Sequence, residues 1–458
     1  MDLTSTVAAI STPYGTGGIS IIRISGTDAI EITDKIFKAS SRKKLSQCPT
    51  HTIHHGKIVS LDDKVIDEVL VSVMKAPKTF TGEDVCEINC HGGLVVTKAI
   101  LEEILRAGAL LADRGEFTKR AFLNGKMDLC KAEAVIDIIT SKTALEQEIS
   151  VNQLGGALSD KINNVRERLI ALCANIQVLI DYPDEGLEDF TDEQFEQELR
   201  DIHSEISTLL KSSNAGLLIR SGIPAAIVGK PNVGKSSLLN LLSGVEKAIV
   251  TDVEGTTRDA IEEYVNLGDI TLRLADTAGI RETKDTVEAI GVERSKEYIK
   301  NSDLIIFMTD AQKELDSRDF EIIDTIGNKK RIALINKCDS GNKISSKELE
   351  PYFEHVIEFS VKTETGVLEL ETAIKNMFEM GDLTNDGSSV ITNARHRDAL
   401  IKAQNAISSA ISTVEALIPP DTTFIDLDEA ISALGEIVGL TVSEEIVDKI
   451  FHKFCIGK

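Results

Sequence analysis

The stretch Gly229-Lys-Pro-Asn-Val-Gly-Lys235-Ser236-Ser237 matches the phosphate-binding pattern G-x-x-x-x-G-K-[ST]. The apolar residues 224–228 before it are predicted to form a short buried strand, and residues 237–242 after it a helix. Glycines let backbone N–H groups close around phosphate oxygens at the positive end of such a helix. Lys235 is expected to reach the outer phosphates and Ser236 to hold Mg²⁺. Because this pattern also occurs by chance, the other motifs of the chain decide its meaning.

The companion motifs follow in the order expected of a GTPase domain. A predicted strand ends in Asp276-Thr-Ala-Gly279, a D-x-x-G loop that senses a γ-phosphate, and another ends in Asn336-Lys337-Cys-Asp339. The Asp339 carboxylate can accept hydrogen bonds from the N–H and exocyclic NH₂ that guanine has and adenine lacks. Together with the stretches at residues 256–259 and 360–362, these motifs make five elements in the expected order. Such an order is unlike a chance match and predicts a GTPase domain.

Two shorter stretches complete that set. Ser360-Val-Lys362 follows a predicted strand and suits a second wall of the base pocket. Thr256-Thr257-Arg258-Asp259 lies between the phosphate loop and D-x-x-G, where a switch supplies a threonine to Mg²⁺.

Composition bounds the remaining interpretations. A chain of 458 residues suggests about three domains, at roughly 150 residues per domain. The net charge of −24 argues against a broad electrostatic grip on nucleic acid but leaves room for a local basic surface. Seven cysteines, an odd number, suggest reduced thiols. With neither a basic leader nor an apolar run of bilayer length, we expect a cytoplasmic protein that does not enter a membrane.

Residues 1–121 are predicted to be a mixed α/β region. The turn at residues 12–18 imitates a dinucleotide-binding fingerprint, but Ser20 stands where its last glycine is required. Cys86, Cys90 and His91 suggest a metal, yet no second ligand pair stands nearby, and buried thiols are favoured over zinc. Glu87 lies in mid-strand, and the residues alone support a solvated strand face and a functional carboxylate equally.

Helical patterns flank the GTPase segment on both sides. Residues 162–179 and 199–209 carry apolar side chains at intervals of three and four, and this pattern resumes at residues 400–414, 424–438 and 441–451. The last of these helices is expected to open with a capping box from Thr441 to Glu444. We therefore predict a GTPase domain inserted into one helical domain, with domains at 1–121, 122–219, 220–378 and 379–458.

GTP hydrolysis needs an oriented water and neutralisation of charge on the transferring phosphoryl group. Ras-type proteins place a glutamine after D-T-A-G, but this chain has Ile280, so the water must be oriented from elsewhere, and residues 282–288 offer acids. Each of these acids is more often a solvated helix residue than a catalyst. The neutralising charge is expected from Arg258, from a partner or from a monovalent cation, for which the Asn232 side-chain carbonyl is a suitable ligand.

The chain as a whole resembles the MnmE (TrmE) family of tRNA-modification GTPases. Besides the GTPase motifs, the resemblance rests on Thr12-Pro-x-Gly-x-Gly-Gly18, Ile22-Arg23-Ile-Ser-Gly26, Phe80-Thr-Gly-Glu-Asp-Val85, Gly115-Glu-Phe-x-x-Arg-Ala-Phe-Leu-Asn124 and the C-terminal Phe454-Cys455-Ile-Gly-Lys458. The terminal tetrapeptide is the most specific of these. It is a poor prenylation signal, because Gly457 and Lys458 do not fit C-a-a-X.

This resemblance implies an α/β multidomain protein. It would have an N-terminal α+β domain that binds tetrahydrofolate and dimerises, a helical domain, and an inserted Ras-like P-loop GTPase domain with a mostly parallel sheet. Arg23, Glu87, Lys126 and Lys458 would line a site for a one-carbon donor, 5-formyl- or 5,10-methylene-tetrahydrofolate. A homodimer would join an FAD-containing partner in a heterotetramer and place an aminomethyl or carboxymethylaminomethyl group on C5 of the tRNA wobble uridine.

The resemblance also assigns roles within the GTPase domain. Hydrolysis would be stimulated by K⁺, bound by Asn232, Thr251, Val253 and Thr256, while Thr257 would join Ser236 on Mg²⁺ and Glu288 would position the hydrolytic water. The expected GTP-binding residues are Asn232, Val233, Gly234, Lys235, Ser236, Ser237, Thr251, Asp252, Val253, Glu254, Gly255, Thr256, Thr257, Asp276, Thr277, Ala278, Gly279, Asn336, Lys337, Asp339, Ser360 and Lys362. For Cys455, a redox or nucleophilic role and a structural thiol stay equally open.

Two other classes of function remain as alternatives. A ribosome-assembly GTPase switch would carry similar motifs, including Asn232, but would need an RNA-binding appendage after the GTPase domain, where this chain is helical and acidic. A signalling switch that depends on an activating protein is disfavoured by Ile280 and Glu288. The sequence therefore favours a GTPase hydrolase of tRNA modification.

Overall fold

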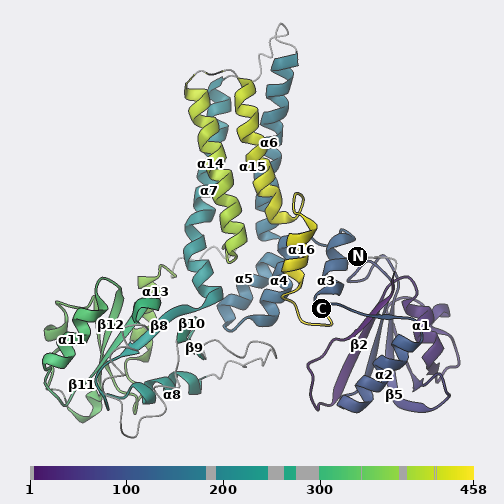
Figure 1. The fold of residues 1–458 in the computed structure, drawn as a ribbon, viewed down its shortest axis with the longest axis horizontal. Coiled ribbons are helices and arrows are strands. Elements are labelled where there is room, and N and C mark those ends of the chain that lie inside the picture. The colour runs from purple at the N-terminus through teal and green to yellow at the C-terminus, as the bar shows by residue number, and fades with distance from the viewer. Residues whose placement is uncertain are drawn as a thin grey trace. The chain divides into compact units, whose positions relative to one another are not determined.

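The computed structural model describes residues 5–181, 192–245, 263–274, 299–341, 343–380, 389–416, 418 and 420–458. The chain forms two compact units, Met1–Ile136 with Gly435–Lys458, and Asp137–Leu434. Figure 1 shows the elements of each unit.

The first unit is built on a seven-stranded sheet with the order β3-β4-β5-β6-β2-β1-β7. All neighbouring strands pair antiparallel except β1 and β7, which are parallel. The strands are β1 (Val7–Ile10), β2 (Ile19–Ser25), β3 (Phe37–Ala39), β4 (Thr52–Val59), β5 (Val65–Met74), β6 (Val85–His91) and β7 (Leu110–Leu111).

Alternation along the central strands decides which side chains meet the core. Helices α1 (Ala29–Ile36) and α2 (Leu94–Arg106) pack with Ile22, Ile24, Cys86 and Ile88 in one apolar cluster. Successive side chains of a strand point to opposite faces, so Arg23 and Glu87 lie on the other face of the same strands. Cys86 and Cys90 are buried, as expected, and burial raises the pKa of the Cys86 thiol to about 12. No group of three metal-ligating side chains occurs among the described residues.

A small helical cluster completes the first unit. Helices α3 (Glu116–Leu123), α4 (Leu129–Thr140) and α16 (Glu444–Phe451) bury Leu129, Val447 and Phe451 together. Helix α16 begins after Ser443, so the capping box expected between Thr441 and Glu444 is wrong. The helix and the chain end belong to this unit, whereas the sequence predicts that residues 379–458 belong to the helical domain. The domain boundaries themselves stay a prediction.

The second unit contains a six-stranded sheet with the order β13-β12-β11-β8-β10-β9. Every neighbouring pair is parallel except β9 with β10. The strands are β8 (Ile223–Val228), β9 (Glu263–Leu267), β10 (Ile270–Leu274), β11 (Leu304–Asp310), β12 (Lys330–Asn336) and β13 (His355–Phe359). The expected mostly parallel sheet is confirmed.

Helices cover both faces of this sheet, which explains why the central strands β8 and β11 are mostly apolar. On one face Ile306 and Leu334 share a core with α8 (Lys235–Val245) and α13 (Val367–Met377). On the other, Phe307 and Ala333 share a core with α11 (Ser317–Ile326). The short helix α12 (Ser346–Leu349) contacts β13.

Long helices before and after the GTPase segment pack together (Figure 1). They are α5 (Ala144–Leu154), α6 (Ala157–Asp181), α7 (Asp192–Ser221), α14 (Ala394–Glu415) and α15 (Pro420–Val438). Arg168 on α6 pairs with Glu198 and Glu205 on α7, and Gln404 on α14 donates to Ser207 on α7. Because α7 precedes the GTPase segment and α14 follows it, the predicted insertion is confirmed.

Within the described residues, no helix combines the length and the apolar character that a membrane span requires. The acidic stretch at residues 182–191 and the polar linker at residues 381–388 lie outside the described residues.

Candidate nucleotide and folate sites

The phosphate-binding loop joins β8 to α8, as its motif predicts. Gly229 and Gly234 have φ angles of +148° and +108°, in the region that favours glycine. A Cβ at Gly229 would lie 2.2 Å from the Met308 carbonyl oxygen, and one at Gly234 would lie 2.3 Å from Asn336 Nδ2. Both glycines therefore allow a close approach of backbone that no larger residue permits, which is the cradle that a phosphate needs.

Lys235 is the first residue of helix α8, and its side chain folds back over the phosphate-binding loop. Its Nζ donates hydrogen bonds to the carbonyl oxygens of Gly229 at 2.7 Å and Lys230 at 2.8 Å. Burial lowers the pKa of the ammonium to about 8, because removal from water disfavours its charged form. The side chain is thus held where it can exchange carbonyl oxygens for phosphate oxygens. Ser236 and Ser237 follow on the first turn of α8 and are exposed.

Lys230 fastens the loop to helix α11. Its Nζ lies 2.6 Å from Asp319 Oδ2 and 2.8 Å from Asp316 Oδ2. Asp316 caps α11 and Asp319 completes the capping box, so one ion-paired cluster fixes both the loop and the helix start. The sequence motif did not predict this anchor, since Lys230 occupies a variable position of the pattern.

The N-K-x-D loop lies directly beside the phosphate-binding loop. Asn336 Nδ2 donates to the Val233 carbonyl oxygen at 2.8 Å, which joins the two loops at the carboxyl edge of the parallel sheet. The Asn336 Oδ1 accepts from the Val361 backbone N–H at 3.3 Å. Ligands of open parallel sheets bind at this edge, outside the carboxyl ends of the strands.

The Asp339 carboxylate is positioned by two serines. Ser360 Oγ donates to one oxygen at 2.8 Å and Ser340 Oγ to the other at 3.1 Å. These hydrogen bonds, with a smaller contribution from the Lys362 charge, lower the pKa of Asp339. The carboxylate is therefore an ionised acceptor at neutral pH, as recognition of two guanine N–H groups requires. Lys362 itself is exposed.

Asp310, at the end of β11, joins the site although the sequence motifs did not predict it. Its Oδ2 lies 2.6 Å from Lys337 Nζ, which also donates to the Asn232 carbonyl oxygen at 3.2 Å. Burial alone would raise the pKa of Asp310, but the hydrogen bonds from Lys337 and the Gln312 backbone N–H, together with the charges of Lys337 and Lys313, outweigh it and lower the pKa. Its position at the carboxyl end of a predicted parallel strand is the sequence feature that could have placed it in the nucleotide site. Asn232 is exposed, with a φ angle of +64°.

The remaining predicted nucleotide contacts lie outside the described residues. They are Thr251, Asp252, Val253, Glu254, Gly255, Thr256, Thr257, Asp276, Thr277, Ala278 and Gly279, and Arg258, Ile280 and Glu288 lie outside them as well. The structure thus brings together the phosphate loop and the guanine loop from the predicted set.

In the first unit, Arg23 and Glu87 form a cross-strand ion pair. They stand opposite each other on β2 and β6, and Glu87 Oε1 lies 2.8 Å from both Nε and Nη2 of Arg23. The guanidinium carbon lies 5.5 Å from the centre of the Phe117 ring and 5.8 Å from that of Phe80. The Glu87 side chain is 23% exposed, so the pair is neither fully solvated nor fully buried.

The C-terminal segment brings Lys458 to this pair. The Phe117 backbone N–H donates to the Lys458 carbonyl oxygen at 3.1 Å, and Ser11 Oγ donates to the Gly457 carbonyl oxygen at 2.9 Å. Burial lowers the pKa of Lys458, the Arg23 charge lowers it further, and Glu87 opposes both. These three predicted residues therefore act on one another electrostatically.

Cys455 and Lys126 lie at the margin of this cluster. Cys455 is exposed, and its carbonyl oxygen accepts from the Gly115 N–H at 3.3 Å. Lys126 Nζ donates to the Pro77 carbonyl oxygen at 3.0 Å, and no contact with Arg23, Glu87 or Lys458 is found among the described residues.

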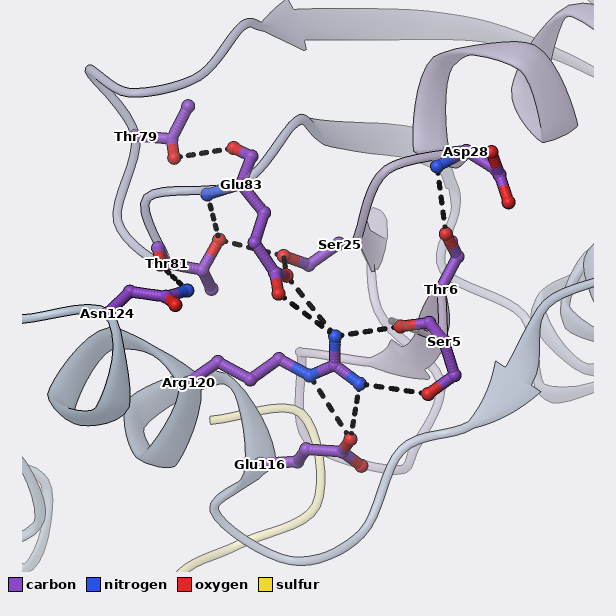
Figure 2. A network of polar contacts seen from close by, with 10 residues as sticks. All are labelled: Ser5, Thr6, Ser25, Asp28, Thr79, Thr81, Glu83, Glu116, Arg120 and Asn124. Atoms are coloured by element: carbon purple, nitrogen blue, oxygen red, sulfur yellow. Dashed lines mark hydrogen bonds and ion pairs between the residues drawn. The ribbon is translucent and has the colours of Figure 1, made fainter. Parts of the chain in front are cut away.

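A buried network explains two motifs for which the sequence supplied no role. Figure 2 shows the Arg120 guanidinium, which is fully buried, between the carboxylates of Glu83 and Glu116 at 3.1 Å and 2.8 Å. It also donates to the Ser5 carbonyl oxygen at 2.8 Å, while Asn124 donates to the Thr81 carbonyl oxygen. The motifs at residues 80–85 and 115–124 therefore bind each other and fix α3, which carries Phe117, on the sheet domain.

A phosphate loop and a guanine loop joined at the carboxyl edge of a parallel sheet define the second unit as one that contains a P-loop GTPase domain. Family models agree for the whole chain. One described as "MnmE helical domain" matches residues 129–455, and one described as "GTP-binding protein TrmE N-terminus" matches residues 6–126.

Full-length relatives share the same name, "tRNA modification GTPase MnmE". The protein of Acetivibrio thermocellus is 49% identical over 456 residues, with 99% of each chain covered. That of Lactobacillus gasseri is 46% identical over 455 residues, covering 99% of this chain and 98% of its own. That of Clostridioides difficile is 45% identical over 460 residues, with 100% of both chains covered. The chain therefore belongs to the MnmE family of tRNA modification GTPases.

Proposed function

We propose that this chain is a K⁺-stimulated GTPase that acts in modification of the tRNA wobble uridine with an FAD-containing partner. As a member of the MnmE family it is a GTPase that takes part in tRNA modification. The finer proposal is that GTP hydrolysis supports addition of an aminomethyl or carboxymethylaminomethyl group to C5 of the uridine. The working form would be a homodimer bound to its partner in a heterotetramer. In this proposal it works in the cytoplasm, consistent with the absence of a disulfide among its seven cysteines.

The observation that carries the GTPase assignment is the hydrogen bond that joins the phosphate loop to the guanine loop. Because Asn336 binds the Val233 carbonyl oxygen, base and phosphates of one nucleotide would meet both loops at once. Lys235 would neutralise charge on the outer phosphates, and the Ser236 hydroxyl would hold Mg²⁺ together with Thr257. Asn232 would contribute its carbonyl to K⁺ with Thr251, Val253 and Thr256. Glu288 would orient the attacking water.

The Arg23, Glu87 and Lys458 cluster supports the folate part of the proposal. A carboxylate suits the pair of N–H donors on a pterin ring, and cations suit the glutamate tail of a folate. Both Arg23 contacts end on Oε1 of Glu87, so Oε2 is the oxygen that the pterin would meet. The bound tetrahydrofolate derivative would supply the one-carbon unit. Arg23 would hold the Glu87 side chain in place, and Lys458 would bring a second positive charge to the same site.

GTP turnover in KCl and in NaCl at matched ionic strength tests the cation part of the proposal. We expect strong stimulation by K⁺ in the wild type, loss of that stimulation in Asn232→Ala, and near-zero turnover with intact GTP binding in Glu288→Ala. Equal rates in both salts would contradict the K⁺ mechanism. Arg258 or an activating protein would then be the source of the positive charge that neutralises the transferring phosphoryl group.

Isotope transfer tests the modification part. With ¹³C-labelled methylene-tetrahydrofolate, GTP, the partner and an unmodified tRNA, we expect the label in the wobble nucleoside by mass spectrometry. Label that is absent with wild-type protein but present in a parallel positive-control reaction would contradict the folate donor.

A further inference from the structure

Charge is distributed very unevenly along this acidic chain. Residues 1–126 hold 16 lysines and arginines against 15 aspartates and glutamates, whereas residues 127–458 hold 34 against 59. A polyanion is therefore repelled by most of the chain and meets no net repulsion at the N-terminal domain. Any RNA contact of this chain is most favourable where cations of this domain gather.

Six cations gather at the β3 end of the seven-stranded sheet. We name this set the basic edge; its members are Arg42, Lys43, Lys44, Lys57, Lys75 and Lys78. All are exposed except Lys75, which is half-buried. None of the six forms an ion pair with a described residue, whereas neighbouring Lys38 is paired with Asp63. Their charges are therefore not neutralised within the described part of the domain.

The chain path brings five of these cations, Arg42, Lys43, Lys44, Lys57 and Lys75, near one another. Lys57 stands next to Lys38 in the β3–β4 register, and the Arg42 N–H donates to the Ala39 carbonyl oxygen in the turn that follows β3. Lys75 Nζ reaches the Ser46 carbonyl oxygen at 3.0 Å, which places it beside the loop that carries residues 42–44. Lys78 follows Pro77, whose carbonyl oxygen binds Lys126.

The acidic side chains near these residues are already engaged by other groups. Asp34 accepts from the backbone N–H groups of Leu45 and Ser46, at 2.7 Å and 3.1 Å. Asp84 accepts from the Ala76 N–H at 2.8 Å, and Glu68 pairs with His55 at 2.8 Å. These carboxylates hold the local backbone or a histidine, and none of them forms an ion pair with the six cations in the described part of the domain.

We propose that the basic edge binds the phosphate backbone of the tRNA substrate. This inference rests on the proposed function and names the surface that would perform part of it. Lysine and arginine side chains that displace counterions from phosphates supply sequence-independent affinity and set register without reading bases. An unpaired, exposed cluster is suited to that task because binding breaks no ion pair of the protein.

The position of the basic edge suits a substrate of the proposed folate site. In the sheet order β3-β4-β5-β6-β2, strand β4 lies two strands from β6, which carries Glu87. At about 4.8 Å between neighbouring strands, β4 and β6 are roughly 10 Å apart across the sheet. Along the strands, the register places Ile53 of β4 in line with Glu87, and Lys57 stands four residues further, which is roughly 14 Å at about 3.4 Å per residue. Phosphates held at the basic edge would therefore keep a nucleotide a few positions along the tRNA within reach of the Arg23 and Glu87 pair.

Binding of an unmodified tRNA transcript to the full-length protein at several KCl concentrations tests this inference. The variant is Lys43→Gln/Lys44→Gln, which removes two cations of the basic edge. The matched control is Lys161→Gln/Lys211→Gln, which removes two exposed cations from α6 and α7. GTP turnover without tRNA serves as the folding check, because neither pair lies in the GTPase domain.

Each lost phosphate contact lowers the slope of log K against log salt by about 0.7–0.9. We therefore expect the double variant to lose about 1.4–1.8 from the slope and to bind roughly 15- to 30-fold more weakly near 0.15 M salt. The control is expected to bind as the wild type does.

Four results would overturn the inference. Unchanged affinity and slope in the variant, with tRNA still bound, would overturn the basic edge alone and leave the proposed function standing. An equal loss in variant and control would show an effect of overall charge rather than of this surface. Altered self-association in sedimentation with unchanged tRNA binding would assign the surface to a protein contact. Absence of any binding by the wild type would count against the RNA part of the proposed function as well.

Discussion

Replacement of Asn266 by alanine tests how the GTPase domain is held on the helical domain. Asn266 lies on β9, is 6% exposed, and donates from Nδ2 to the Lys142 carbonyl oxygen at 2.7 Å. Its Oδ1 accepts from Thr271 Oγ1 on β10 at 3.1 Å. Beside it, Lys142 Nζ lies 3.3 Å from the centre of the Tyr264 ring. One amide therefore ties the hairpin of β9 and β10 to the turn before α5.

The turn that receives this hydrogen bond is itself fixed. The Lys142 N–H donates to Glu146 at 2.7 Å, and the Glu146 N–H donates to Thr143 Oγ1 at 3.2 Å. The same hairpin separates the two predicted switch segments, residues 251–259 and 276–279. Movement of either switch would consequently pull on a hairpin that is anchored in the helical domain.

The expected cost follows from the two hydrogen bonds. Alanine at position 266 takes one partner from a backbone carbonyl and one from a threonine that is 2% exposed. Loss of a partner for a buried polar group costs about 1–3 kcal/mol. We expect unfolding of this unit to be easier by about that amount, with GTP affinity nearly unchanged and tRNA modification reduced more than GTP turnover.

Guanidinium unfolding, GTP binding, GTP turnover and tRNA modification are measured on the same preparations. Asn164→Ala, on an exposed position of α6, is the matched control and is expected to change none of them. A stability change below about 0.5 kcal/mol, together with wild-type modification per GTP hydrolysed, would refute the reasoning, since surface substitutions produce effects of that size.

Three further predictions concern single side chains. Burial holds the pKa of Lys235 at about 8, and the protonated ammonium attracts phosphate. GTP binding near and above pH 8 should therefore take up protons, and GTP affinity should fall as the pH rises. Calorimetry in two buffers of different ionisation enthalpy measures this proton uptake. Arg120→Met should destabilise the first unit by roughly 3–5 kcal/mol in thermal unfolding, because it strands two largely buried carboxylates; an unchanged transition would contradict the account of Figure 2. Lys458→Ala should weaken binding of a tetrahydrofolate derivative about tenfold while leaving GTP turnover unchanged, since it removes one charge-assisted contact; equal folate affinity would argue against the proposed site.

The sequence predicted best where a motif and a periodic pattern coincide. The predicted strand at residues 224–228 and the helix after the phosphate loop correspond to β8 and α8, and Asn336 proved to join the guanine loop to that loop. Local rules suffice there, because glycine conformation, strand ends and helix starts depend on neighbours in the chain. The apolar face of residues 162–176 is buried for the same reason.

Such local rules could not predict contacts between segments that are distant in the sequence. The pairing of Arg120 with Glu83, of Lys337 with Asp310 and of Lys230 with Asp319 depends on which strands and helices become neighbours in space. The resemblance to a known family named Arg23 and Glu87, but their opposition on β2 and β6 is a matter of register. The capping box at Thr441 failed because helix α16 begins two residues later than predicted, after Ser443, whose side chain makes no cap hydrogen bond.

The most direct test of the central claim is nucleotide specificity in Asp339→Asn. The Asp339 carboxylate accepts hydrogen bonds, while an asparagine amide also donates, so the variant should favour xanthine, which has a carbonyl where guanine has its exocyclic NH₂. Loss of a charge-assisted hydrogen bond costs about 1.5–3 kcal/mol, equivalent to roughly 10- to 150-fold in affinity. We predict that Asp339→Asn binds GTP more weakly by such a factor and hydrolyses XTP with a lower KM than the wild type. Unchanged KM values for both nucleotides would contradict the placement of guanine against Asp339 and with it the nucleotide site described here.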